Sequence, residues 1–144
     1  MIEERRESIV EMTAIEQVVN MCRIVKDEIN ELYLMLRNYN NVESVELSKH
    51  YDKVRGIKNK GEDLVVLTLE YLVRSSEVTF YSSNYINIVK ILDRVLQQID
   101  AVAYRVYLAH ENKIILYKDV LDIFIKIIDL EKNEIEKYLL LFQT

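Results

Sequence analysis

Apolar side chains recur at alternating steps of three and four residues along most of this chain. In the first run, from about Glu3 or Ser8 to Asn38, the repeating positions are Ile15, Val18, Cys22, Val25, Ile29, Leu32, Leu36 and Tyr39. This spacing keeps side chains on one face of an α-helix that lies nearly parallel to its neighbours. The pattern therefore predicts one long helix, which ends where residues 38–41 interrupt it with asparagines.

The same pattern predicts a second helix over about residues 42–74. Its inner positions are Leu47, Tyr51, Val54, Gly61, Val65, Thr68 and Leu72, with Lys58 as the weakest position. Both glycines of the chain, Gly56 and Gly61, fall inside this helix. A glycine in a helix interior costs about 1 kcal/mol relative to alanine, so each glycine indicates a close helix contact or a kink.

Serines and asparagine between Ser75 and Asn84 predict a loop, followed by a third helix from Tyr85 to about Ala109. A turn at residues 110–112 leads to a fourth helix, from Lys113 to Phe142, which carries two apolar stripes. Such a broad apolar arc is typical of a helix that is central in its bundle or shared between subunits. We expect the central position, and we also expect a homo-oligomer.

Composition agrees with a bundle. The 144 residues suffice for one domain, 1–144, and they include no proline and only two glycines. Sheet proteins need turn residues every few positions, whereas a few long helices need few turns. We therefore predict an all-α fold, an antiparallel bundle of four long helices.

Charge and hydropathy exclude several classes of protein. The net charge is −5, and basic residues form no stripe interleaved with aromatics, so a nucleic-acid partner is not expected. The most apolar stretch, residues 114–130, is interrupted by five charges, namely Lys118, Asp119, Asp122, Lys126 and Asp129. We expect no membrane insertion and a cytoplasmic location. Cys22, the only cysteine, is predicted to be a buried thiol.

Two motifs that could support chemistry involve the histidines of this chain. Di-iron bundles need Glu-x-x-His pairs, and no Glu stands three residues before His50 or His110. Arg105-Val-Tyr-Leu-Ala-His110 resembles the active motif of HEPN-domain ribonucleases, which are also helical bundles. A cation that stabilises phosphate charge beside a histidine that moves protons would suit RNA cleavage. The alternative is that His110 caps the end of a helix.

The region from Val54 to Leu108 resembles the PhoU-like family, in particular the small phosphate transport regulators and accessory proteins of Pit-type phosphate transporters. In that family one helix carries an acidic-x-x-x-Asp motif, and a second helix carries leucine-Asp-x-x-x-Asp. Here Asn59 and Asp63 occupy the first motif, and Leu92, Asp93 and Gln97 occupy the second. The resemblance implies an antiparallel helical bundle.

The resemblance also implies a metal site. The family's paired acidic motifs bind metal clusters, so Asp63 and Asp93 are the expected ligands of a weakly bound divalent metal ion. Asn59 and Gln97 stand where the family has acids, and their amide oxygens would be helpers, as would the carboxylate of Glu62 or Asp100. The alternative is a polar layer in which the first four of these side chains hydrogen-bond across the two helices.

We therefore expect a non-enzymatic, PhoU-like regulatory or accessory protein that acts through protein–protein contacts. The resemblance implies a link to phosphate transport, with a membrane phosphate transporter as partner. Two alternatives stay open: a HEPN-type ribonuclease that uses Arg105 and His110, and a structural helical-bundle protein that oligomerises.

Overall fold

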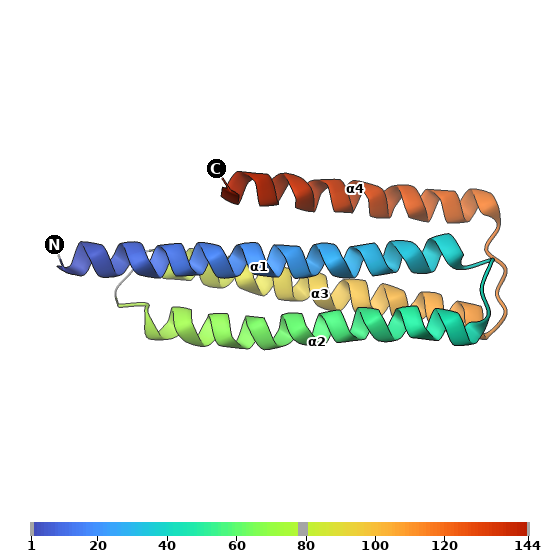
Figure 1. Ribbon diagram of the computed structural model, residues 1–144, viewed down its shortest axis with the longest axis horizontal. Coiled ribbons are helices and arrows are strands. Elements are labelled where there is room, and N and C mark those ends of the chain that lie inside the picture. Colours follow the sequence, from blue (N-terminus) through green and yellow to red (C-terminus); the bar gives the residue numbers. More distant parts are fainter. Residues whose placement is uncertain (1, 78–80, 144) are drawn as a thin grey trace.

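The computed structural model describes residues 2–77 and 81–143 and is all-helical over these ranges. Four long helices run up and down: α1 (Ile2–Asn38), α2 (Ser44–Arg74), α3 (Ser82–Glu111) and α4 (Lys118–Gln143). Successive helices are antiparallel, as Figure 1 shows. The predicted fold class, an all-α bundle of four long helices, is confirmed.

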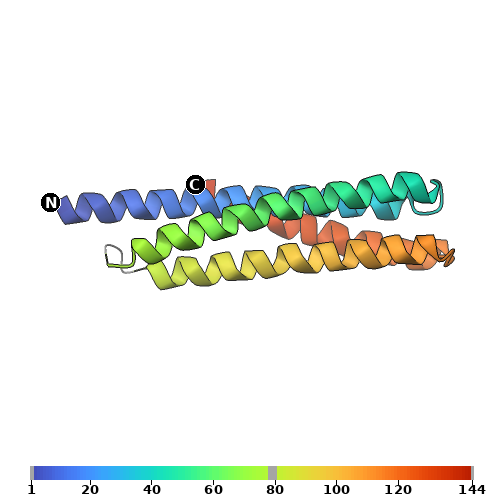
Figure 2. The ribbon, with the colours of Figure 1, turned by 90° about the horizontal axis from the view of Figure 1, so that it is seen from below.

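Helix α1 is the centre of the molecule. It packs against each of the other three helices, and α2 and α3 also pack against each other. Helix α4 packs against α1 on the side away from α2 (Figures 1 and 2). The bundle is therefore a three-helix core with α4 laid along the outside of its central helix.

The predicted inner faces of α1 and α2 are the buried ones. All seven predicted inner positions of α2 are buried, as are seven of the eight predicted for the first run, counting Tyr39 just after α1; Ile15 is half-buried. Gly61 lies at a close contact of three helices, because a Cβ built there would stand 2.6 Å from Leu96 Cδ1 and 3.2 Å from Ile24 Cγ2. Nothing lies within 4 Å of a Cβ built on Gly56. The two glycines thus differ: only Gly61 permits close packing.

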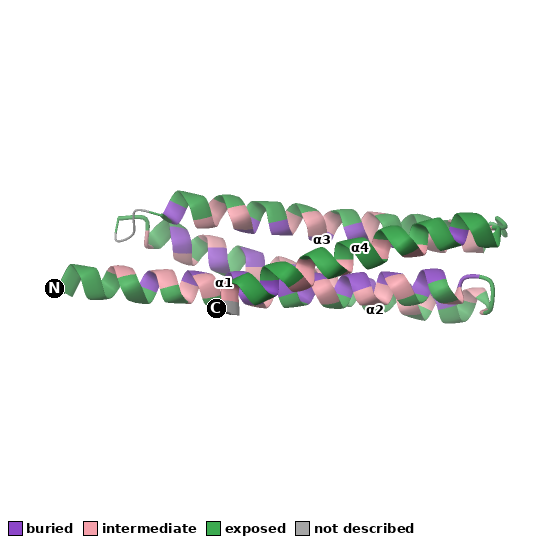
Figure 3. Ribbon diagram, turned by 90° about the horizontal axis from the view of Figure 1, so that it is seen from above, coloured by how far each residue is buried: buried purple, intermediate pink, exposed green. Residues whose placement is uncertain are grey.

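The predicted central position of the fourth helix is wrong. Over residues 118–142 of α4, only Leu121 and Leu139 are buried, and much of the apolar arc faces the surface. In Figure 3, α4 is mostly green, the colour of exposed residues, whereas α1 carries the purple of buried ones. The reason is that α4 packs against α1 alone, while the core on the other side of α1 is filled by α2 and α3.

The predicted start of the fourth helix is also wrong: α4 begins at Lys118 and not at Lys113. The end of α3 explains this, because Lys113 has a positive φ of 56° and the N–H of Ile114 donates to Ala109 O. That bond and the one from Lys113 N–H to His110 O form a Schellman motif, which stops a helix. The Tyr39 hydroxyl then donates to Ile114 O at 2.7 Å and holds the connection against the end of α1.

The connection between α2 and α3 is shorter than predicted. Helix α3 begins at Ser82 rather than Tyr85, and the Ser82 hydroxyl donates to Leu72 O at 3.0 Å, which ties the start of α3 to the end of α2. Residues 78–80 of the predicted loop lie outside the described residues. Within the described ranges, no helix has both the length and the uninterrupted apolar character needed to cross a bilayer.

Candidate functional site

An apolar groove lies between α3 and α4, and we call it the α3–α4 groove. One wall comes from α3 and the other from α4 and the segment before it, while Leu36 of α1 lies at its floor. It encloses about 480 Å³ and is lined by Leu36, Val102, Arg105, Val106, Ala109, Leu116, Phe124, Ile127 and Ile128. Arg105 is the single charged side chain among these lining residues.

The groove continues along α1 towards its middle. There the floor is Ile29 and Leu32, and the lining also includes Val95, Ile99, Val102 and Ile128. Gln98 of α3 and Glu131 of α4 add polar groups on the two sides. The α3–α4 groove is therefore an elongated slot that runs parallel to the helices, with an apolar floor and mainly apolar walls.

Next to this groove, α4 presents a row of exposed apolar side chains, which we call the outer stripe. It consists of Val120, Ile123, Phe124, Ile127 and Leu130, and these side chains are 42–66% exposed. Scattered apolar residues are normal on a protein surface, but a continuous apolar row beside an apolar groove marks an interaction site. In the sequence, the outer stripe falls within the broad apolar arc of the fourth helix, and the structure leaves these side chains exposed.

Arg105 and His110 line different hollows. Arg105 lies at the α3–α4 groove, whereas His110 lines a hollow at the end of the bundle with Tyr39 and Ser44. Both ring nitrogens of His110 have protein partners: Nε2 is 3.0 Å from Val42 O, and Nδ1 is 3.3 Å from Ser44 Oγ. His110 thus joins the end of α3 to the α1–α2 connection. Its ring partners are therefore in that connection and at the start of α2, and they are not the carbonyls at the end of α3 that the alternative expected.

A polar layer crosses the bundle between α2 and α3. Lys58 Nζ lies 3.7 Å from Asp100 Oδ2 and 3.7 Å from Glu62 Oε1. The Gln97 amide donates to Glu62 Oε1 at 2.6 Å and to Asp93 Oδ1 at 3.4 Å. The layer therefore links the two helices through Glu62 and Lys58, neither of which stands at a position of the family motif.

The predicted metal ligands occupy different surroundings. Asp93 is half-buried and accepts from Gln97, whereas Asp63 and Asn59 are exposed. Among the described residues, no group of three or more His, Cys, Asp or Glu side chains is placed to hold a metal ion. Metal binding by Asp63 and Asp93 stays a prediction.

Glu28 of α1 is a buried carboxyl group that sequence reasoning missed. Its side chain is 0% exposed, and neither of its oxygens has a hydrogen-bond partner. Its pKa is raised to about 9, mainly by burial and also by the negative charge of Asp100, while the positive charge of Lys58 opposes the shift. Glu28 is therefore a neutral acid at pH 7.

A signal for Glu28 was present in the sequence. Ala14, Met21, Glu28 and Met35 follow one another at intervals of seven, and all four are 0% exposed. A heptad position whose other members are apolar indicates burial of the one charged member. Cys22, one position after Met21, is buried as predicted, and burial raises the pKa of its thiol to about 11.

Comparisons of this chain with protein-family models, with curated proteins and with solved structures find no match. The fold class and the site are therefore defined by the chain's own geometry: a four-helix protein with an apolar groove and an adjoining apolar helix stripe.

Proposed function

We propose that this chain is a non-enzymatic protein that acts by binding an amphipathic helix of a partner protein in the α3–α4 groove. The observation that carries the proposal is the groove together with the outer stripe of α4. Both are apolar, they adjoin, and they leave side chains such as Ile123 and Leu130 more than half exposed. Covering such a surface releases water from apolar area and is favourable.

The dimensions of the groove suit a helix better than a small compound. It is open along its length, its floor follows α1 from Ile29 to Leu36, and its walls are the antiparallel helices α3 and α4. An amphipathic helix would place side chains at i, i+3, i+4 and i+7 in such a groove. Arg105 at the groove would favour a helix that carries a carboxylate at the matching position.

The PhoU-like resemblance of residues 54–108 extends this proposal. It supports a regulatory or accessory role linked to phosphate transport, a cytoplasmic location, and a helix of a membrane phosphate transporter as one candidate partner. A divalent metal ion on Asp63 and Asp93, with Asn59 and Gln97 as helpers, belongs to the same proposal. Elemental analysis of protein purified without chelator tests the metal.

Binding can be tested with a synthetic 21-residue helix that has Leu at heptad positions a and d and Glu and Lys elsewhere. We expect saturable binding that shifts the methyl NMR signals of Val102, Val106 and Ile127. Val102→Glu, in the groove wall, should weaken binding at least about tenfold, since it places a charge in the apolar contact.

The matched control is Val66→Glu, because Val66 is an exposed valine on α2, away from the groove lining. This variant should bind the peptide like the unmodified protein. The proposal fails if the peptide does not saturate the groove of the monomeric chain, or if both variants lose binding equally.

A further inference from the structure

We propose that the occupant of this surface is a second copy of the same chain. In this dimer α4 packs antiparallel on the partner's α4, with Ile123 and Phe124 next to the two-fold axis. The two α3–α4 grooves then face each other and close into one shared apolar core. The inference rests on the proposed function, since it names the partner of the same groove.

The apolar residues of α4 have the symmetry that such a dimer requires. A two-fold interface is self-complementary. If one residue of the first copy contacts another residue of the second copy, the same two residues also meet with the copies exchanged. Counted from the Ile123–Phe124 pair, Val120 and Ile127 lie three residues away on either side, and Tyr117 and Leu130 lie six residues away. In an antiparallel pair centred there, Val120 faces the partner's Ile127, and Ile123 faces the partner's Phe124. All six side chains are at least 42% exposed in the single chain.

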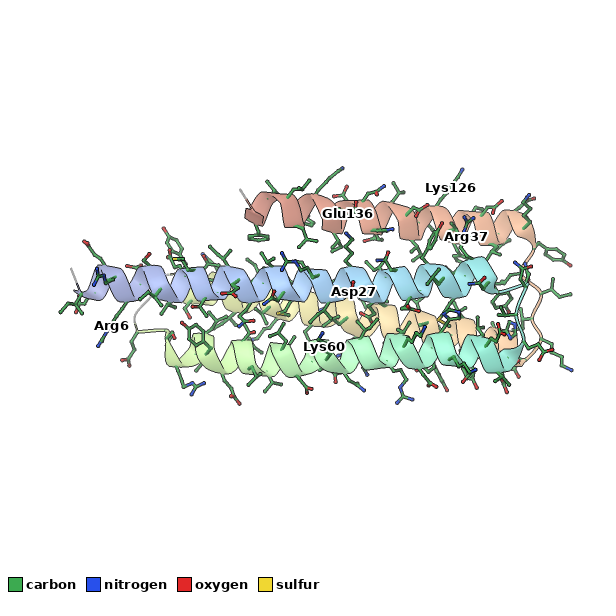
Figure 4. All side chains as sticks on the ribbon, in the orientation of Figure 1. Arg6, Asp27, Arg37, Lys60, Lys126 and Glu136 are labelled. Atoms are coloured by element: carbon green, nitrogen blue, oxygen red, sulfur yellow. The ribbon has the colours of Figure 1, made fainter. Side chains whose placement is uncertain are left out.

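Charge complementarity supports the same register. Lys126 points away from α1, as Figure 4 shows, and Asp119 and Asp122 are also exposed. Within the described part of the chain, none of these three groups forms an ion pair. In the antiparallel register, Lys126 lies level with Leu121 of the second copy, between the partner's Asp119 and the partner's Asp122. The two-fold axis repeats this arrangement, so the interface gains two such clusters.

Two acidic residues follow the apolar row of α4. After Leu130, Glu131 and Glu134 stand on the side of the outer stripe, and exposed apolar side chains return on that side at Tyr138 and Leu141. In the dimer Glu131 and Glu134 pass beyond the start of the partner's α4 at Lys118. The first turn of a helix has unpaired N–H groups and attracts negative charge. These two acidic residues are therefore complementary to the start of the partner's helix.

Oligomeric state is the first test. Sedimentation equilibrium of the full chain should show a dimer, and Ile123→Glu should weaken association at least about 100-fold, because the charge enters the symmetric interface twice. Ile123 is 58% exposed, so the variant should keep the helical circular dichroism of the parent. Leu67→Glu, a 63% exposed leucine on α2, is the matched control and should remain dimeric.

Disulfide trapping tests the register. In a Cys22→Ser background, Val120→Cys and Ile127→Cys are purified separately, mixed and oxidised. The register places these two positions opposite each other, within reach of a disulfide, so the mixture should give the mixed disulfide dimer. Each variant alone should cross-link far more slowly. Rapid cross-linking of either variant to itself, with no mixed product, would overturn the proposed register.

A monomer at millimolar concentration overturns the inference. The proposed function is tested separately. If the synthetic Leu heptad peptide still shifts the methyl signals of the groove, the proposed function holds and the groove binds the helix of a different protein. If neither a second copy nor the peptide binds, both the inference and the proposed function are wrong.

Discussion

At the scale of single residues, the two glycines of α2 differ in how much space surrounds the position of a Cβ atom. Gly61 is buried against Leu96 and Ile24, whereas Gly56 is exposed with no atom within 4 Å of the Cβ position. Alanine favours a helix over glycine by about 1 kcal/mol at either site. At Gly61 this gain is opposed, because Leu96 is fully buried and has little room to move away from the new methyl group.

We therefore expect Gly56→Ala to stabilise the protein by about 0.5–1 kcal/mol and Gly61→Ala to destabilise it by about 1–2 kcal/mol. Urea unfolding followed by circular dichroism measures both changes, and each variant serves as the control for the other. Equal stabilisation by both alanines would show that Gly61 is not needed for close helix packing.

At the scale of helices, the end of α3 depends on a residue in an unfavourable conformation. Lys113 adopts φ of 56° in the Schellman motif, at the position where glycine is most common. Since a side chain is strained there, Lys113→Gly should raise the free energy of unfolding by about 0.5–1 kcal/mol. Lys113→Ala removes the charge but keeps the Cβ, so it should leave stability within about 0.5 kcal/mol. A gain from Lys113→Ala equal to that from Lys113→Gly would point to charge instead of backbone strain.

The same helices show how far sequence patterns predict this fold. The three-and-four spacing identified the buried face of α2 at all seven positions, because the neighbours of that face are fixed by a closed three-helix core. For α4, the pattern showed two apolar stripes but could not show which neighbour covers each. Its start was missed since a lysine, and not a glycine, occupies the helix-stopping position at residue 113.

The candidate site was predicted less well, for a geometrical reason. Successive residues of a helix point about 100° apart, so a motif carried over from a family can be one position away from the inner face. With Gly61 and Val65 buried, Glu62 borders α3 and Asp63 faces outwards. The groove could not be predicted at all, because it depends on where α4 lies relative to α3.

At the scale of the whole molecule, Glu28 couples folding to pH. The folded protein holds the Glu28 proton up to a pKa of about 9, whereas the unfolded chain releases it near the ordinary value of 4.5. Folding therefore takes up a proton between these pH values, so this contribution to stability is complete below pH 4.5 and is lost as the pH rises to 9. The free energy of unfolding should fall with a slope that approaches about 1.4 kcal/mol per pH unit.

Glu28→Gln tests this coupling, because the amide has nearly the same shape and cannot ionise. Denaturant unfolding at pH 6 and pH 9 should show a strong loss of stability for the parent chain and a much smaller loss for the variant. Asp100→Asn is the matched comparison: it removes the negative charge that faces Glu28, so it should lower the Glu28 pKa, which makes the loss of stability end at a lower pH and reduces its total size. If the parent and Glu28→Gln lose equal stability, Glu28 is already ionised in the folded protein, and the pH dependence has another origin.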